Sequence, residues 1–154
     1  MPPENEGILP PDRANYPGID TETDEGAEQT VKFFFDAMYY GYATGDTVPI
    51  ENVASENCTQ CIVAIKDIRR RTQVDGTFLV GHNSEPLEIH VSAPESDQRT
   101  TIYYAYKEGA AAGISQDGGQ QVFLERKMHS ATDLAFIEGR WSVVDIAWEE
   151  NLQE

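Results

Sequence analysis

The chain has 154 residues, which is enough for one domain with a sizeable hydrophobic core. Its formal net charge of −16 argues against binding to nucleic acid or to an anionic membrane surface, because both need clustered Lys and Arg side chains. The sequence has no run of 18 apolar residues and no pattern typical of a metal or cofactor site, so we expect no membrane-spanning helix, no metal and no cofactor.

Residues 1–23 are predicted to form a disordered, acidic linker ahead of a single folded domain over residues 24–154. The segment has few apolar side chains and holds five of the eight prolines of the chain. Such a composition cannot bury enough apolar surface to offset the entropy that is lost on ordering. No signal peptide is recognisable at the start of the chain.

A long helix is predicted to begin near Thr23 and to end at Gly45. Acidic residues favour its N-terminus, and glycine is a typical stop. Its apolar residues form two stripes at helical spacing, and the second stripe contains Phe33 and Tyr40. A helix that is apolar on two sides is expected to be sandwiched between a sheet and other helices. The alternative is that Phe33 and Tyr40 form an exposed patch for a partner protein.

The only two cysteines, Cys58 and Cys61, open the next predicted helix, which Asn57 is placed to cap. Residues three apart are neighbours on a helix, and the pair shares a face with Ile62, Ile65 and Ile68. A structural disulfide is the favoured interpretation, with buried free thiols and a redox or metal-binding pair as alternatives. The preceding segment is not the strand of a redox motif, and the histidines lack the spacing of a zinc site. A lasting disulfide would indicate an oxidising compartment.

After Gly76 the apolar period changes to two, which is typical of strands. Strands are predicted around residues 87–91, in TTIYYAYK, in QVFLERKMHSATDLAFI with a bend near Ser130, and in EGRWSVVDIAWE after a tight turn at Glu138 and Gly139. The segment AAAGISQDGGQ is predicted to be a loop. Helices followed by a meandering sheet define an α+β class, with N-terminal helices packed on a curved antiparallel sheet of four or more strands.

This order of elements resembles the nuclear transport factor 2-like (cystatin-like) cone. The segment EGAEQTVKFFFDAMYYGYATGDTVPIENVASENCTQC is similar to an uncharacterised family of actinobacterial lipoproteins, the domain of unknown function 6318. The matching features are Glu25-Gly26-Ala27, the aromatic helix, ATGDT and the Cys-x-x-Cys pair. The resemblance implies a removed N-terminal lipid anchor, a proline-rich linker and a location at the outer face of the cell membrane. It implies no activity.

Cone folds often enclose a pocket, so polar residues on apolar strand faces are candidates for catalysis. Asp145 shares a predicted face with Trp141 and Val143, and Arg126 is in phase with Met128. Both are candidate pocket residues that could pair with each other, together with Tyr39 from the long helix. No histidine stands at the spacing of a known catalytic motif.

The leading hypothesis is a non-catalytic extracytoplasmic domain that binds a partner protein or a small apolar ligand. One alternative is a cone-pocket enzyme, isomerase- or dehydratase-like, that uses Asp145. The other is a homodimeric assembly module that associates through an open sheet face.

Overall fold

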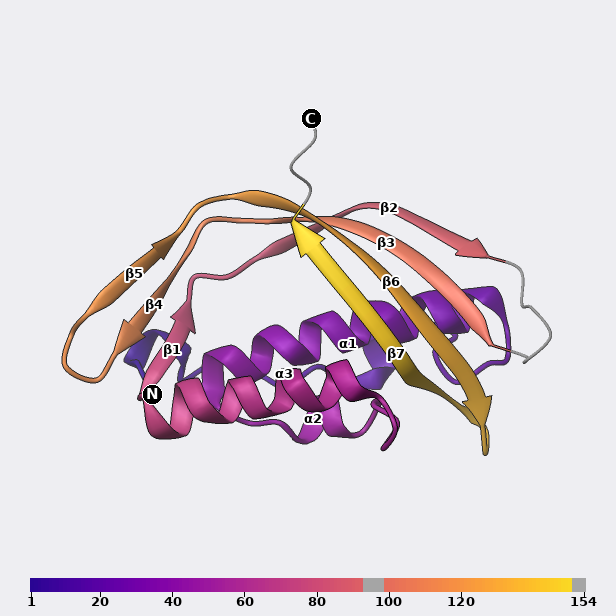
Figure 1. Ribbon diagram of the computed structural model, residues 1–154, viewed down its shortest axis with the longest axis horizontal. Coiled ribbons are helices and arrows are strands. Elements are labelled where there is room, and N and C mark those ends of the chain that lie inside the picture. The colour runs from indigo at the N-terminus through magenta and orange to yellow at the C-terminus, as the bar shows by residue number, and fades with distance from the viewer. Residues whose placement is uncertain (93–98, 151–154) are drawn as a thin grey trace.

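The computed structural model describes residues 1–92 and 99–150 (Figure 1). In this part of the chain the α-helices are α1 (Asp24–Thr44), α2 (Val48–Glu51) and α3 (Thr59–Arg69). Two 3-10 turns, η1 (Pro3–Asn5) and η2 (Arg13–Asn15), precede α1, and a π-helical segment, η3 (Arg70–Val74), continues α3. The strands are β1 (Thr77–Val80), β2 (Ser84–Ser92), β3 (Thr100–Glu108), β4 (Ala111–Ser115), β5 (Gln120–Phe123), β6 (Arg126–Ile137) and β7 (Arg140–Glu150).

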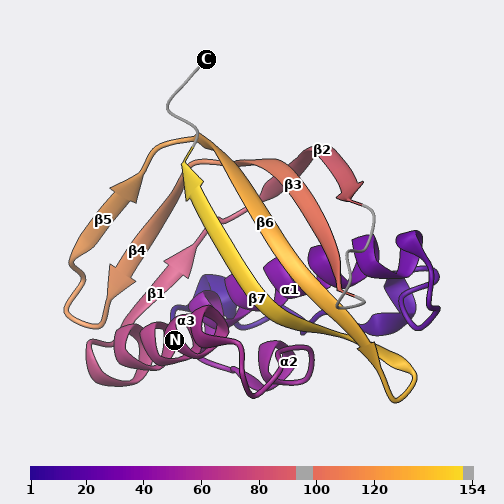
Figure 2. The ribbon, with the colours of Figure 1, turned by 45° about the vertical axis from the view of Figure 1, so that its right-hand side comes forward.

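The strands pair antiparallel in two sheets, one in the order β2-β3-β6-β7 and a smaller one in the order β1-β4-β5. Strand β3 continues into β4, and β5 continues into β6, so both sheets share two long bent strands. The α-helices lie on one side of the larger sheet (Figure 2). The arrangement confirms the predicted α+β class with helices packed on a curved antiparallel sheet.

Helix α1 is the centre of the core. Thr23 caps it by accepting a 3.0 Å hydrogen bond from the Gly26 N–H, and Gly45 ends it at φ 83°. Gly26 is required by close packing, because a Cβ atom there would lie 2.1 Å from the Thr21 carbonyl oxygen. Both predicted apolar stripes are largely buried, as the sandwiched interpretation expects: Val31, Phe33, Phe34, Phe35, Ala37 and Met38.

Residues 1–23 differ from the expected disordered linker, because several of their side chains are anchored on the domain. Asn5 is 2% exposed, and its side-chain nitrogen donates to the carbonyl oxygens of Ala43 (2.8 Å) and Leu79 (2.9 Å). Ile19 is buried, and the Trp141 indole donates to the Thr21 carbonyl oxygen at 2.8 Å. The composition of the segment predicts disorder because only a few of its residues form these anchors, and the average composition does not reveal them. The predicted domain end at residue 154 lies outside the described residues.

Two strand predictions were wrong in detail. The predicted loop 110–120 contains β4, whose two alanines and a glycine have a low strand propensity and therefore gave a weak signal. The long strand breaks at residues 124–125 rather than near Ser130, and the break marks the passage from the small sheet to the large one. The predicted turn at Glu138 and Gly139 is confirmed, with both residues at positive φ (53° and 81°).

Candidate functional site

The interior between α1 and the larger sheet is filled by aromatic side chains. The ring of Phe35 lies 5.8 Å from that of Tyr104, 5.1 Å from that of Tyr106 and 6.3 Å from that of Trp148. These distances are typical of packed aromatic pairs. A small hollow of about 170 Å³ remains beside this core, and we call it the mouth hollow; it is lined by Met38, Tyr39, Tyr42, Arg71, Leu79, Glu108, Phe123, Arg126, Met128 and Trp148.

A connected polar cluster lines the mouth hollow. The Tyr39 hydroxyl donates to the carboxylate of Glu108 and lies 2.8 Å from the Tyr106 hydroxyl. Arg126 donates from Nε to Glu108 Oε1 at 2.9 Å, and Glu108 is only 6% exposed. Burial and the neighbouring Tyr106 and Glu108 raise the pKa of Tyr39 far above its ordinary value, so this hydroxyl stays protonated. Tyr39, Tyr106, Glu108 and the Nε of Arg126 are therefore hydrogen-bonded to one another within the cluster.

Of the three catalytic candidates, the structure brings Tyr39 and Arg126 together and leaves Asp145 out. The predicted pair of Arg126 with Asp145 is replaced by the ion pair with Glu108. Glu108 and Tyr106 were missed as site residues. Tyr106 and Glu108 follow Ile102 and Tyr104 at every second position, so the alternation of β3 predicts that Glu108 points inward. A carboxylate on the apolar face at the end of a strand was therefore the signal in the sequence.

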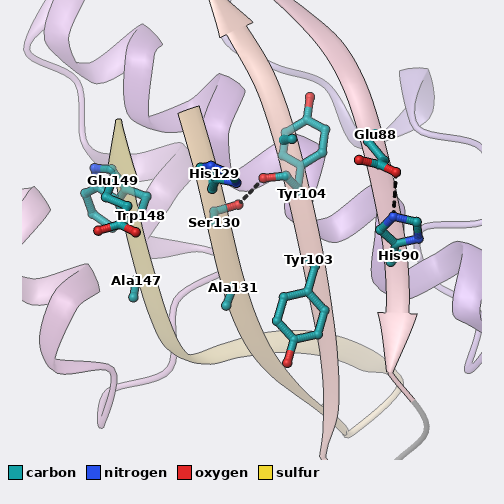
Figure 3. A pocket seen from close by; sticks show the side chains of 11 residues that line it. Glu88, His90, Tyr103, Tyr104, His129, Ser130, Ala131, Ala147, Trp148 and Glu149 are labelled. Atoms are coloured by element: carbon teal, nitrogen blue, oxygen red, sulfur yellow. Dashed lines mark hydrogen bonds and ion pairs between the residues drawn. The ribbon is translucent and has the colours of Figure 1, made fainter. Parts of the chain in front are cut away.

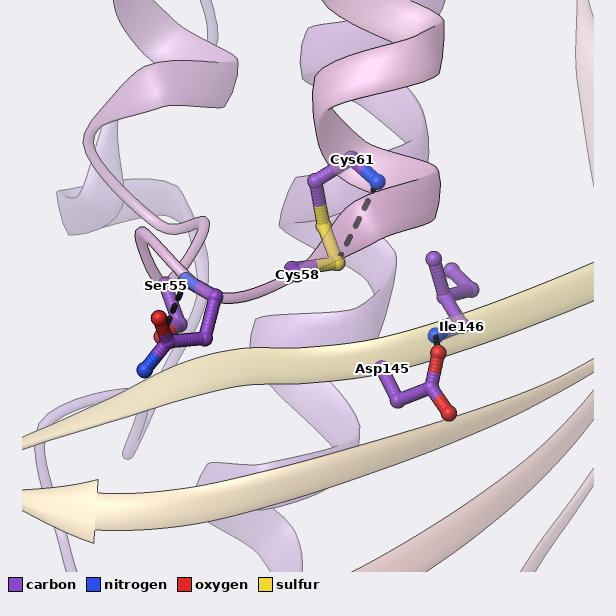
Figure 4. The surroundings of a disulfide bond; sticks show 6 residues. Ser55, Cys58, Cys61, Asp145 and Ile146 are labelled. Carbon is purple, nitrogen blue, oxygen red and sulfur yellow. Dashed lines mark hydrogen bonds between the residues drawn. A yellow bond between two sulfur atoms is a disulfide. The ribbon is translucent and has the colours of Figure 1, made fainter.

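Asp145 lies on the outer side of the sheet, where it is exposed. A bulge between β6 and β7 causes this, because Val143 pairs with Leu134 while Asp145 pairs with Asp133, which leaves Val144 unpaired. The extra residue reverses the alternation, so Ile146 is buried in place of Asp145. Asp145 Oδ1 accepts a hydrogen bond from the Ile146 N–H at 2.9 Å (Figure 4). The predicted pocket position of Asp145 was wrong.

The proposed patch of Phe33 and Tyr40 does not form an exposed surface. Phe33 is 3% exposed, since Tyr16 packs against its ring at 5.3 Å and the Arg13 guanidinium lies 5.7 Å from its ring centroid. Tyr40 is half-buried, with its hydroxyl 3.4 Å from Asp46. The N-terminal segment, through Arg13 and Tyr16, thus covers Phe33 of the second apolar stripe, whose exposure the sequence could not decide.

The cysteines form a disulfide at the start of α3 (Figure 4). Both are fully buried, and Cys58 rather than Asn57 caps the helix, with its sulfur accepting from the Cys61 N–H at 3.2 Å. Ile65 and Ile68 on the shared face are buried, whereas Ile62 is 40% exposed. The disulfide thus fixes the first turn of α3 against the core. Such a bond is typical of extracellular and periplasmic proteins.

The outer face of the larger sheet, opposite the helices, carries a second hollow of about 440 Å³ (Figure 3). Cross-strand pairing arranges its side chains in two rows. One row holds His90, Tyr103, Ala131 and Ala147, and the next holds Glu88, Ala105, His129 and Glu149. The short alanine side chains form the bottom of the hollow, while the side chain of Tyr103 projects from the sheet and is 50% exposed. We call this surface the outer face.

The strand order, the bent long strands and the helix layer define a class, the nuclear transport factor 2-like fold. Structural relatives support it at low identity. The intermembrane space region of the chloroplast protein ARC6 is 11% identical, with a TM-score of 0.63 over 84% of this chain and 98% of that chain. A nuclear transport factor 2-like superfamily protein from Salmonella enterica is 8% identical, with a TM-score of 0.55 over 85% and 95%.

A third relative, described as a calcium/calmodulin dependent protein kinase II association domain from Xanthomonas campestris, is 9% identical, with a TM-score of 0.52 over 96% of this chain and 99% of that chain. The sequence itself matches the Family of unknown function DUF6318 over residues 11–148, and the chain belongs to this family. No curated protein matches the chain significantly. None of the helices in the described ranges is both long and apolar enough to cross a membrane.

Proposed function

We propose that this protein is a non-catalytic, extracytoplasmic association domain whose working surface is the outer face. Three observations support the proposal. The interior holds packed aromatic rings, Tyr39 and Arg126 of the mouth hollow are bound to Glu108, and Asp145 lies outside. The outer face, in contrast, is an uncovered sheet surface with a hollow, and such surfaces are typical of protein contacts.

A second copy of this chain is the partner that the outer face fits best. Tyr104 and Ser130 are paired in the middle of the sheet and belong to a central, inward-facing row that lies between the two outward rows described above. The outward residues on the two sides of this central row are complementary. Along β3, Tyr103 lies on one side of the row and Ala105 on the other. Along β6, Lys127 and Asp133 stand at equal distances on opposite sides. A large side chain is thus matched by a small one, and a cation by an anion.

A two-fold axis between two facing sheets, running across the strands through this row, would exchange the two sides. Tyr103 of one copy would then lie over Ala105 of the other, and Lys127 over Asp133. On β2 the same operation would place His90 over Glu88, because Ile89 pairs with Tyr104 in the central row. The isologous contact therefore joins unlike partners at each of these positions. The Xanthomonas association domain, which has the same fold, is in keeping with this assignment.

Sedimentation velocity across a wide concentration range tests the association. We expect a reversible dimer, and we expect Ala131→Arg to weaken it by roughly 30-fold or more, because an unpaired charge would be desolvated at the centre of the contact. Gln121→Arg, at an exposed position of β5 on the smaller sheet, is the matched control and should dimerise as the wild type does. A wild-type protein that stays monomeric at the highest concentration would refute the association.

We further propose that an N-terminal lipid anchor holds the domain at the outer face of the cell membrane. The disulfide supports an oxidising location, and the anchor is what the family resemblance of the sequence implies. The test is thiol alkylation of protein recovered from its native envelope, followed by mass analysis. Cys58 and Cys61 should be fully protected until a reductant is added. Free thiols in the native protein, or recovery in the soluble cytoplasmic fraction, would contradict the proposed location.

A further inference from the structure

Two arginine side chains from distant parts of the chain line the mouth hollow. Arg71 comes from η3 and Arg126 from the start of β6, and their side chains are 42% and 39% exposed. With Glu108, the third charged residue of the lining, their formal charges sum to +1. Asp67 and Glu150, the further carboxylates near the two arginines, lie outside this lining, whereas the hollow on the outer face has Glu88 and Glu149 in its own lining.

Each guanidinium is held through Nε, which leaves its terminal amino groups available. Arg71 donates from Nε to Asp67 Oδ2 at 3.1 Å, and its guanidinium carbon lies 6.0 Å from the Tyr42 ring centroid. Arg126 donates from Nε to Glu108, and the nearest further carboxylate oxygen, on Glu150, is 3.9 Å from Nη1, beyond hydrogen-bonding distance. Within residues 1–92 and 99–150, the terminal nitrogens of Arg71 have no hydrogen-bond acceptor. Both guanidinium groups are therefore held in place through Nε, while their terminal amino groups remain available to a ligand.

The remaining wall of the hollow is apolar, with Leu79, Phe123, Met128 and Trp148 around the two arginines. Its volume of about 170 Å³ is below the roughly 300–1,000 Å³ of pockets for drug-sized ligands. It corresponds to about six water volumes at about 30 Å³ each, which suits a small organic molecule.

We propose that the mouth hollow binds a small organic carboxylate with an apolar body. The carboxylate would accept hydrogen bonds from the terminal amino groups of Arg71 and Arg126, and the apolar body would contact Phe123 and Trp148. Planar, bidentate recognition by guanidinium groups favours a carboxylate. The lining charge of +1 favours a monoanion over a dianion such as phosphate, because Glu108 faces the same space. The inference is independent of the proposed association.

Calorimetric titration with benzoate, and with benzyl alcohol as a neutral ligand of matched size, tests this site. We expect benzoate to bind at least tenfold more tightly than benzyl alcohol, and more tightly than inorganic phosphate. Arg71→Gln should weaken benzoate binding by roughly tenfold or more. Arg70→Gln is the control, because Arg70 also pairs with Asp67 but does not line the hollow, and it should leave the affinity unchanged.

Arg71→Gln is preferred over Arg126→Gln, since loss of Arg126 would leave the buried Glu108 without its cation and could unfold the domain. Ala131→Arg on the outer face should bind benzoate like the wild type, which separates this site from the association. The proposal is overturned if benzoate does not bind, if benzyl alcohol binds equally well, or if Arg71→Gln and Arg70→Gln have the same effect.

Discussion

His82 lies flat against Tyr39, with ring centroids 3.8 Å apart and an interplanar angle of 14°. Its Nε2 atom is buried, with no hydrogen-bond partner among the residues that the structure describes. Burial lowers the pKa of His82 to about 4, although the nearby charge of Glu108 acts in the opposite direction. The imidazole is therefore neutral in the folded protein at pH values where it is charged in the unfolded chain.

This histidine gives a prediction for acid stability. Its ordinary pKa is about 6.5, so between about pH 6.5 and pH 4 the unfolded state binds a proton that the folded state does not. The neutral His82 therefore costs the fold nothing above pH 6.5. As the pH falls from there toward 4, protonation of the unfolded chain lowers the free energy of unfolding, by roughly 3 kcal/mol at most. Urea denaturation at several pH values should show a shallower loss for His82→Phe, which keeps the aromatic stack.

The control for this experiment is Gln121→Arg on β5, which adds no group that titrates between pH 4 and pH 6.5 and should follow the wild-type pH dependence. If His82→Phe loses stability across the same interval as steeply as the wild type, the buried neutral imidazole is not the cause.

At the scale of the elements, α3 depends on the disulfide at its first turn. By the chain-entropy model, so short a closed loop stabilises the fold by only about 2 kcal/mol. Reduction should therefore lower the free energy of unfolding by about 2 kcal/mol and leave the protein folded, as measured by urea denaturation with and without dithiothreitol. The double variant Cys58→Ala/Cys61→Ala should show no response to the reductant. Complete unfolding on reduction would instead make the disulfide a condition of folding.

The elements also show what the sequence could and could not predict. Helix α1 was predictable because its cap, its glycine stop and its apolar stripes are local signals. Strand β7 was predictable as a strand, but the face of Asp145 was not, because a single bulged residue reverses the alternation and is set by the pairing with β6. Glu108 follows Tyr104 and Tyr106 at every second position of β3, so the alternation of the strand could have placed it on the buried face.

For the whole molecule, the long-range contacts were the unpredictable part. The Asn5 side chain binds Ala43 and Leu79, which follow it in the chain by 38 and 74 positions. No local pattern in a polar, proline-rich segment predicts such an anchor. Likewise, Arg71 and Arg126 line one hollow although they come from η3 and from β6, and no local pattern in the sequence links them. The fold class follows from the order of elements, whereas both candidate surfaces follow from the tertiary arrangement.

The association through the outer face is the central claim, and a charge-exchange experiment tests it most directly. Lys127→Glu alone should disrupt the dimer, because its new charge would face the Asp133 of the second copy. Asp133→Lys alone should do the same, since two cations would then meet. In a mixture of the two variants both contacts join opposite charges, so native mass spectrometry should detect a heterodimer while each variant alone is monomeric. A mixture that stays monomeric, or single variants that dimerise like the wild type, would contradict the two-fold arrangement.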